Sequence, residues 1–399
     1  MRKCLVVLLF LAACTTESKK DHEVTKPVEQ AKHDTIENPA VIVPKEPPAK
    51  PNDTLTAIAQ LISGKADSSG LYPKIAANKH YKSFSESFSK RWTIFDTTRI
   101  VKLESFQKST LHEKVSQEKT LFYPFSGPDI LHASLFFPDA ERYVLIALEP
   151  VGDLPDFEKT NPDSLQKYYK RLNTSLNAIL NFSFFRTESM SKDLKNEEVD
   201  GSLHLLFLFL NRLGNQIVSA KPITIDSTGN IVYMNSFEQL KTSKLQTKGV
   251  EIKFLSKDGQ LKTMEYYSLN AVDYALKKNK GFTNYLATIN HFNTYLKGAS
   301  YLLHKDYFSI IRNKILEGSS TIVQDDSGIA LRYFEKETGK WEYSLYGEYT
   351  KPVSLFSKQY QKDLDSLYKK QGSSALGFGL GYNFKDKNSN LMIINRKTK

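Results

Sequence analysis

The 399-residue sequence predicts an α+β fold with a mixed, largely antiparallel sheet and packed helices. Short apolar runs of strand length are more often separated by turn residues, as in hairpins, than by single helices. Longer amphipathic runs with a helical period lie among them. A third observation, the low apolar content just ahead of residue 53, predicts that a disordered tether precedes this body.

The first residues have the pattern of a secretory signal. Arg2 and Lys3 precede an apolar run over 5–13 and a small-residue site that ends at Cys14. The run is shorter than the roughly 20 residues that a membrane-spanning helix needs. The motif LAAC, which ends at Cys14, resembles the lipobox of bacterial lipoproteins. The resemblance implies that the signal peptide 1–13 is removed and that Cys14 carries diacylglycerol on its sulfur and a fatty acid, such as palmitate, on its amino group. The alternative is an ordinary signal peptide.

The surroundings of Cys14 bear on the membrane that it would enter. Thr15 follows it, where an aspartate would be the familiar signal for inner-membrane retention, so the resemblance favours the outer membrane. The charged stretch 17–23 is similar to the export tags of Bacteroidota lipoproteins, and the cell surface and the periplasmic face both stay open. The other cysteine, Cys4, lies in the segment to be removed. The mature chain would therefore have no disulfide, cysteine nucleophile or cysteine metal site.

Residues 14–52 hold the lipidated cysteine and a stretch rich in Lys, Glu and Pro with almost no aromatic residues. Such a composition cannot form a core and predicts a flexible tether between the membrane and the body. Residues 53–399 remain for the globular body and suffice for a large core. The charged stretch 191–201 predicts either a subdomain boundary or a long surface loop.

The body contains strand and helix patterns in mixed order. Expected strands are 143–148, 203–210, the two arms of a hairpin at 249–267, 321–324, 329–334, 341–346, 376–384 and 390–395. The run LHLLFLFL at 203–210 has strand length and is interpreted as a buried central strand. Expected helices are one that opens at 161–163, one over 296–315 with a break near Asp306, and one over 356–367 that Gly372 ends.

The first candidate loop is Ser126-Gly127-Pro128-Asp129, which precedes the most apolar strand. Pro128 fixes its own φ and Asp129 is a preferred helix cap, so the loop predicts the start of a short helix that Pro138 ends. In the alternative, the N–H groups of this helix start bind an anionic group together with Ser126, Gly127 and Asp129. Ser126 is also a candidate nucleophile, although the G-x-S-x-G spacing of a nucleophile elbow is missing.

The second candidate loop is 324–328, between two expected strands, and its Asp-Ser-Gly composition predicts a hairpin turn. In the alternative, Asp325 or Asp326 is a general base or metal ligand with His304 from the preceding helix. Adjacent residues of a strand point to opposite sides, so at most one of the two carboxylates faces a given pocket. Arg332, just downstream, is a candidate ligand-binding residue.

Several segments of the body together resemble a family of uncharacterised secreted or lipid-anchored bacterial proteins. The matching segments are 123–129 (YPFSGPD), 148–152 (LEPVG), 297–304 (KGASYLLH), 325–334 (DDSGIALRYF), 346–356 (YGEYTKPVSLF) and 377–383. The resemblance implies that these segments belong to one domain and implies no activity. The sequence contains no H-E-x-x-H, P-loop, dinucleotide fingerprint or Cys/His cluster, so no cofactor and no metal are expected.

The formal net charge of +11 is spread along the chain without a dense basic run, so no nucleic-acid partner is expected. Attraction to anionic glycans or lipid headgroups accounts for it more simply. The expected partners are the membrane, through the lipid on Cys14, and an envelope glycan or protein.

Two functional hypotheses follow. The first is a non-catalytic lipoprotein that binds or organises envelope components. The second is a hydrolase of an envelope polymer, with Asp325, Asp326 and His304 around one cleft, either with or without Ser126.

Overall fold

The computed structural model describes residues 48–182, 199–335, 339–385 and 387–397. These belong to one compact unit, Pro48–Lys399. The expected signal, Cys14 and most of the expected tether lie outside the described residues, as does most of the stretch 191–201. Within the described ranges, no helix combines the length and the apolar character needed to cross a membrane.

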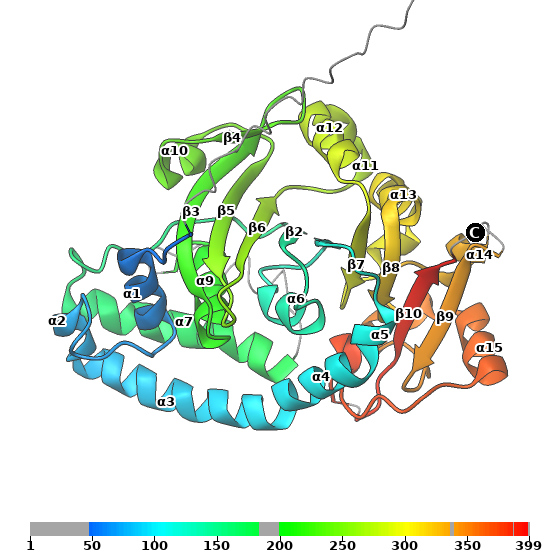
Figure 1. Cartoon of the computed structure of the whole chain (residues 1–399), viewed down its shortest axis with the longest axis horizontal. Coiled ribbons are helices and arrows are strands. Elements are labelled where there is room, and N and C mark those ends of the chain that lie inside the picture. The colour runs from blue at the N-terminus through cyan, green and yellow to red at the C-terminus, as the bar shows by residue number, and fades with distance from the viewer. Residues whose placement is uncertain (1–47, 183–198, 336–338, 386, 398–399) are drawn as a thin grey trace, which may run out of the picture. The chain divides into compact units, whose positions relative to one another are not determined.

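A ten-stranded mixed sheet forms the centre of the body (Figure 1). Its strands are β1 (Thr120–Pro124), β2 (Arg142–Ala147), β3 (Gln216–Ile225), β4 (Ile231–Tyr233), β5 (Lys248–Leu255), β6 (Leu261–Ser268), β7 (Phe292–Leu296), β8 (Ser319–Gln324), β9 (Trp341–Tyr346) and β10 (Leu391–Arg396). They lie in the order β4-β3-β5-β6-β2-β1-β7-β8-β10-β9. The central strands β6 to β8 pair in parallel, and both flanks are antiparallel. The predicted α+β class with a mixed sheet is confirmed.

Helices cover both faces of the sheet. On one face, Leu121 and Tyr123 of β1 lie in a core with α1 (Asp53–Ile62), α2 (Pro73–Ala76), α3 (Lys79–Phe95), α4 (Val101–Phe106), α6 (Ile130–Phe136), α7 (Pro162–Phe182), α9 (Leu203–Arg212) and α10 (Phe237–Thr242). On the other, Phe122 lies in a core with α11 (Asp273–Lys278), α12 (Lys280–Thr288), α13 (Ser309–Gly318), α14 (Leu331–Glu335) and α15 (Lys362–Gln371). The alternation of side chains along β1 thus divides the apolar residues between two cores.

The expected strand at 203–210 is wrong, because this segment is the helix α9. Every residue from Leu203 to Leu210 is at most 2% exposed. A helix that is buried on all sides shows no amphipathic period, so its sequence does not differ from that of a buried strand. The length of this apolar run therefore did not distinguish a strand from a helix.

Two other expected strands are also wrong. Residues 329–334 lead into α14, and 376–384 contain no strand. In the second segment, side chains take the place of a neighbouring strand, since the backbone N–H of Leu376 donates to Asn388 Oδ1 at 2.6 Å and that of Leu380 to Ser389 Oγ at 2.7 Å.

The expected helix at 296–315 is correct only at its end. Leu296 closes β7, two short 3₁₀ turns follow at Leu302–His304 and Asp306–Phe308, and only then does α13 begin. The hairpin of β5 and β6, the helix α7 that begins at Pro162, and the end of α15 at Gly372, which has a φ of 72°, are confirmed.

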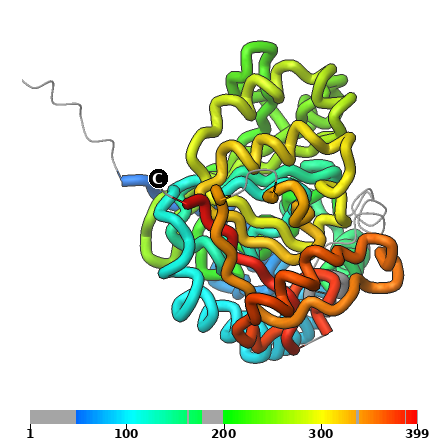
Figure 2. Tube along the Cα trace, turned by 90° about the vertical axis from the view of Figure 1, so that its right-hand side faces the viewer, coloured from blue at the N-terminus to red at the C-terminus, as the bar shows by residue number. Residues whose placement is uncertain are grey.

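The order of the parallel strands creates a topological switch point between β1 and β7. The chain continues from β1 to β2 on one side and from β7 to β8 on the other. The carboxyl ends of β1, β7 and β8 open at the same edge, which is where ligands bind in open α/β sheets. Both views also place α4 and α5 (His112–Lys114) beside the C-terminal part of the chain (Figure 1 and Figure 2). The rings of Phe106 in α4 and Tyr346 in β9 accordingly meet edge to face, with their centroids 5.2 Å apart.

Candidate functional site

The loops that leave β1 and β7 are neighbours, because the two strands pair in parallel, and both contain left-handed backbone. Phe125 has a φ of 59° after β1, while Ser300 and Tyr301 have φ values of 53° and 55° after β7. Each such non-glycine residue costs about 1–3 kcal/mol and persists only where its surroundings impose it. Because such strain gathers at functional sites, two adjoining strained loops mark this edge of the sheet as the candidate site.

A buried ion pair joins these two loops. Lys297, just after β7, places Nζ 2.7 Å from Oδ2 of Asp129, which caps α6 after β1. The same oxygen accepts a hydrogen bond of 2.9 Å from the Tyr123 hydroxyl. Nδ1 of His132 lies 2.8 Å from Oδ1 of Asp129 and 2.9 Å from Nζ of Lys297. None of these four residues is more than 3% exposed, so the network is closed to solvent.

The charges in this network depend on one another. Burial alone would raise the pKa of Asp129, but His132 and Lys297 outweigh it and hold that pKa well below its usual range. Burial lowers the pKa of His132 and of Lys297, which Asp129 offsets only in part. A neutral His132 either donates from Nδ1 to Asp129 or accepts there from Lys297, because one nitrogen does not do both in one tautomer. The same atom positions are therefore compatible with the ring proton of His132 on Nδ1 or on Nε2.

The loop after β8 is tied to the loop after β7 by Asp325. Its Oδ2 accepts from the backbone N–H of Gly298 at 2.9 Å, and its Oδ1 accepts from the backbone N–H of Ser327 at 3.0 Å and from the Ser327 hydroxyl. The Ser327 hydroxyl oxygen accepts from the backbone N–H of Ala299 at 2.8 Å. Burial and then the charge of Asp326 raise the pKa of Asp325 to about 7. Asp325 thus titrates near neutral pH while it holds two loops together.

Asp326 makes separate bonds, as expected for neighbouring residues that point in different directions. The Tyr301 hydroxyl donates to its Oδ2 at 2.6 Å, and Asn390 Nδ2 donates to its Oδ1 at 3.0 Å. The Tyr301 ring also meets the His304 ring edge to face, with centroids 5.1 Å apart. Burial lowers the pKa of His304 to about 3, and its Nε2 has no hydrogen-bond partner among the described residues. Tyr301 therefore contacts both an aspartate and a neutral histidine.

Residues 376–383, which we call the strap, lie against these loops. The Tyr382 hydroxyl donates to the carbonyl of Gly298 at 2.9 Å and accepts from the backbone N–H of Ser300 at 3.1 Å. Gly381, with a φ of 56°, approaches Asp325 so closely that a Cβ atom there would lie 2.0 Å from Oδ2. Glycine is therefore required at 381 both by the backbone conformation and by the neighbouring carboxylate.

One buried hydroxyl at this edge is left without a partner. Tyr295 of β7 is fully buried, and its hydroxyl makes no hydrogen bond within the part of the chain that the structure describes. Burial, followed by the charges of Asp129 and Asp325, raises the pKa of Tyr295 well above its usual value, so the hydroxyl lies in the field of both carboxylates. Leaving such a group unpaired costs about 1–3 kcal/mol. A bound group that hydrogen-bonds to Tyr295 would remove this cost.

The first candidate loop forms the helix start that the sequence predicts. Asp129 caps α6 by accepting from the backbone N–H of His132 at 3.2 Å, and the helix ends at Phe136. The buried Ser126 hydroxyl donates to the carbonyl of Gly127 at 2.6 Å, which fixes it to the backbone.

The second candidate loop is a turn, as predicted, but it leads to α14 and not to a second strand, so the hairpin is wrong. His304 lies in a 3₁₀ turn and not in a helix. Arg332 donates to the carbonyl of His304 at 2.8 Å and so holds this turn. The structure thus brings Asp325, Asp326 and His304 to one edge of the sheet, with Asp129 beside them.

Sequence reasoning missed Lys297, His132, Tyr295 and Tyr301. One signal was present for Lys297, because a lysine directly after an apolar strand is a charge at a strand end. The partner of each residue depends on the strand order, which the sequence did not reveal.

Comparisons with protein-family models, curated proteins and solved structures found no match to this chain. Among the described residues, no group of three or more His, Cys, Asp or Glu side chains is arranged to hold a metal ion.

Proposed function

We propose that this protein is a lipoprotein, anchored in the outer membrane through lipid on Cys14, that binds a small ligand at the carboxyl ends of β1, β7 and β8. The lipobox-like motif supports the anchor, and the switch point supports the place of binding. The observation that carries the proposal is the buried hydroxyl of Tyr295 near the end of β7, which has no hydrogen-bond partner among the described residues and is acted on by the charges of Asp129 and Asp325.

The bonds of the carboxylates favour binding over bond breaking. Asp129 is engaged by Tyr123, His132 and Lys297, while Asp325 and Asp326 hold backbone and side-chain donors on three loops. A general base needs a free lone pair aimed at the proton that it removes. These carboxylates instead keep the loops in place around Tyr295.

The strap controls access in this proposal. Tyr382 and Gly381 lie directly on the loop after β7 and on Asp325, so a ligand reaches Tyr295 only when the strap moves aside. Charged groups enclosed away from water interact strongly with a polar ligand, which would leave slowly. The ligand is therefore expected to stay with the purified protein.

A hydrolase acting on an envelope polymer is the second candidate. The Nε2 of His304 favours it, because this nitrogen has no hydrogen-bond partner among the described residues and lies at the same edge as Asp326. Burial lowers the pKa of His304 to about 3, so a hydrolase would need a bound substrate to make this imidazole a stronger base. This candidate predicts that Asp326→Ala abolishes hydrolysis of envelope polymers by the purified protein. A lack of hydrolysis by the wild type itself leaves only the binding proposal.

The binding proposal is tested by native mass spectrometry of protein purified from its own membranes. Tyr295→Phe removes the unpartnered hydroxyl at the switch point. Tyr169→Phe is the matched control, because the Tyr169 hydroxyl is also buried and unpartnered among the described residues but lies on α7.

We expect wild type and Tyr169→Phe to carry a non-covalent small molecule that Tyr295→Phe loses or holds at least about tenfold more weakly. Equal ligand content in all three proteins would place the ligand elsewhere. Ligand-free wild type would reject the proposal.

A further inference from the structure

A cavity of about 270 Å³ lies at the opposite ends of the parallel strands, away from the loops described above. It is bounded by α4, the end of α6, the loop before β3 and the tip of the β5–β6 hairpin. Its apolar lining residues are Leu135, Tyr143, Leu213 and Phe254. The volume is just below the usual range for small-molecule pockets, and the lining is mixed, because charged and polar side chains lie beside these apolar residues.

One wall of the cavity carries a buried ammonium group. Lys262 is only 5% exposed, and its Nζ donates to the carbonyl of Ala140 at 2.9 Å and to the carbonyl of Pro138. No carboxylate lies within ion-pair distance of it among the described residues. Burial lowers the pKa of Lys262, an effect that Asp139 and Glu141 offset only from a greater distance. An ammonium has three donors, so one remains for a bound group.

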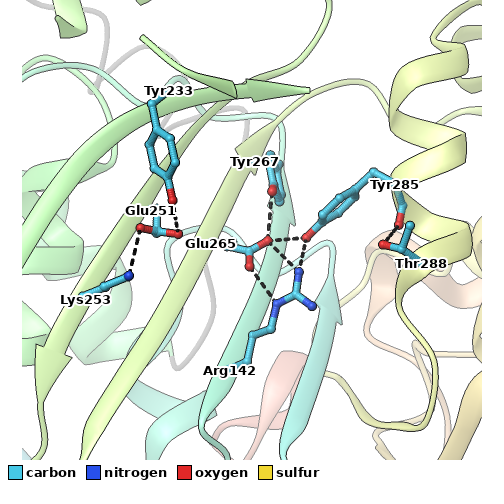
Figure 3. A network of polar contacts seen from close by, with 8 residues as sticks. All are labelled: Arg142, Tyr233, Glu251, Lys253, Glu265, Tyr267, Tyr285 and Thr288. Atoms are coloured by element: carbon cyan, nitrogen blue, oxygen red, sulfur yellow. Dashed lines mark hydrogen bonds and ion pairs between the residues drawn. The ribbon is translucent and has the colours of Figure 1, made fainter. Parts of the chain in front are cut away.

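Arg142, a neighbouring cation in the same sheet, is paired with a carboxylate. Arg142 lies on the opposite face and donates from Nε and Nη2 to Glu265 at 2.7 and 3.1 Å (Figure 3). The hydroxyls of Tyr267 and Tyr285 also donate to Glu265, so that charge is neutralised within the protein. Among the described residues no carboxylate pairs with Lys262, whose ammonium is held by two backbone carbonyls, and a buried charge without a counter-charge is costly. A bound anion can therefore supply the counter-charge that the protein does not provide.

The polar groups around the cavity restrict the ligand further. The Ser134 hydroxyl on its wall has no hydrogen-bond partner among the described residues. The rim carries Lys108 and Lys257 together with Glu104, Asp139 and Asp258, so it holds one more carboxylate than ammonium groups. The preference for an anionic ligand therefore rests on the buried ammonium of Lys262 alone, because the rim does not add to it.

We propose that this cavity binds an amphiphilic monoanion, with its carboxylate or phosphate head on Lys262 and a short apolar tail against Leu135 and Leu213, beside the packed rings of Tyr143 and Phe254. This site is separate from the one proposed at Tyr295, and neither proposal depends on the other. Fatty acids, lipid fragments and small aryl acids share this chemistry.

The test compares ligands that differ only in their head group. The probes are octanoate, octyl phosphate, octanol and octylamine, measured by isothermal titration calorimetry. The protein is the full chain with Cys14→Ala, which needs no detergent that would compete for the cavity. Octanoate or octyl phosphate is expected to bind at least about tenfold more tightly than octanol, and octylamine most weakly. Inorganic phosphate alone is expected to bind too weakly to measure.

Two variants locate the binding. Lys262→Met keeps the length of the side chain and is expected to remove the preference for the anions. Lys253→Met is the control, because Lys253 lies on the same hairpin, on the opposite face of the sheet and half exposed. Leu213→Trp fills the cavity without touching Lys262 and is expected to weaken all the octyl probes.

The proposal is overturned if octanol matches the anions, if octylamine binds best, if no probe binds, or if Lys262→Met keeps the preference. The comparison of head groups needs only the parent protein, so the result does not depend on how well a variant folds.

Discussion

The ammonium of Lys297 lies 2.7 Å from a carboxylate oxygen of Asp129, and both residues are almost completely buried. This pair joins the ends of two adjacent parallel strands, β7 and β1, that are distant in the sequence. Taking two charges out of water is expensive, and their attraction repays the cost only when the geometry and the remaining hydrogen bonds are good. The additional bonds from Tyr123 and His132 meet this condition.

Lys297→Met is expected to lower the free energy of unfolding by about 3–5 kcal/mol, because it leaves the Asp129 carboxylate buried without its partner. Lys369→Met is the control, since Lys369 makes an exposed ion pair of 2.7 Å with Asp365. Denaturant titration of both variants measures the effect. Equal stability of the two variants would show that the buried pair does not hold the strand ends.

Asp325 makes stability depend on pH. Burial and Asp326 raise its pKa from 3.8 to about 7 in the folded chain. Between these two pKa values the folded state keeps a proton on Asp325 that the unfolded state has released. The contribution of Asp325 to the free energy of unfolding is therefore complete below pH 3.8 and is lost as the pH rises towards 7. Asp325→Asn does not titrate. The free energy of unfolding of the wild type minus that of the variant should therefore decrease across this window.

The pH measurement uses that difference because other buried groups titrate in the same window. Burial lowers the pKa of His204 to about 4, which acts in the opposite direction but equally in both proteins. A difference that stays constant from pH 4 to 7 would mean that Asp325 is ionised throughout in the folded protein.

Gly381→Ala tests the contact between the strap and the site. The added methyl group would lie 2.0 Å from Asp325 Oδ2, which the Gly298 N–H holds in place. We expect a loss of about 1–3 kcal/mol beyond that of Gly377→Ala. Gly377 is the matched control in the same strap, since it also has a left-handed φ but open space around its Cβ position. Similar thermal unfolding of the two variants would refute the close contact.

Cys14→Ala tests the proposed anchor by cell fractionation. Without the thiol no lipid is attached, and a chain with no other anchor should move from the membrane fraction to the soluble fraction. Cys4→Ala is the control, because Cys4 lies in the segment expected to be removed. If Cys14→Ala stays with the membranes as firmly as the control, the lipoprotein assignment is wrong.

Local patterns predicted part of the fold. The β5–β6 hairpin was found because Asp258-Gly259 fits a tight turn between alternating strands, and α6 because Asp129 caps it. The helix α9 was missed because burial on all sides erases the helical period.

The candidate site was predicted only in part. The loops at 126–129 and 324–328 were chosen because polar turn residues end apolar strands. Lys297 and Tyr295 were missed, since their roles arise from β1 and β7 being neighbours. That neighbourhood depends on contacts between residues far apart in the sequence, which no local pattern encodes.

The most direct measurement of the central claim is a high-resolution structure of the protein purified from its own membranes. The account predicts non-protein density larger than a water molecule within hydrogen-bonding distance of the Tyr295 hydroxyl, enclosed by the strap. A Tyr295 hydroxyl in contact with protein atoms or a single water molecule only would contradict it.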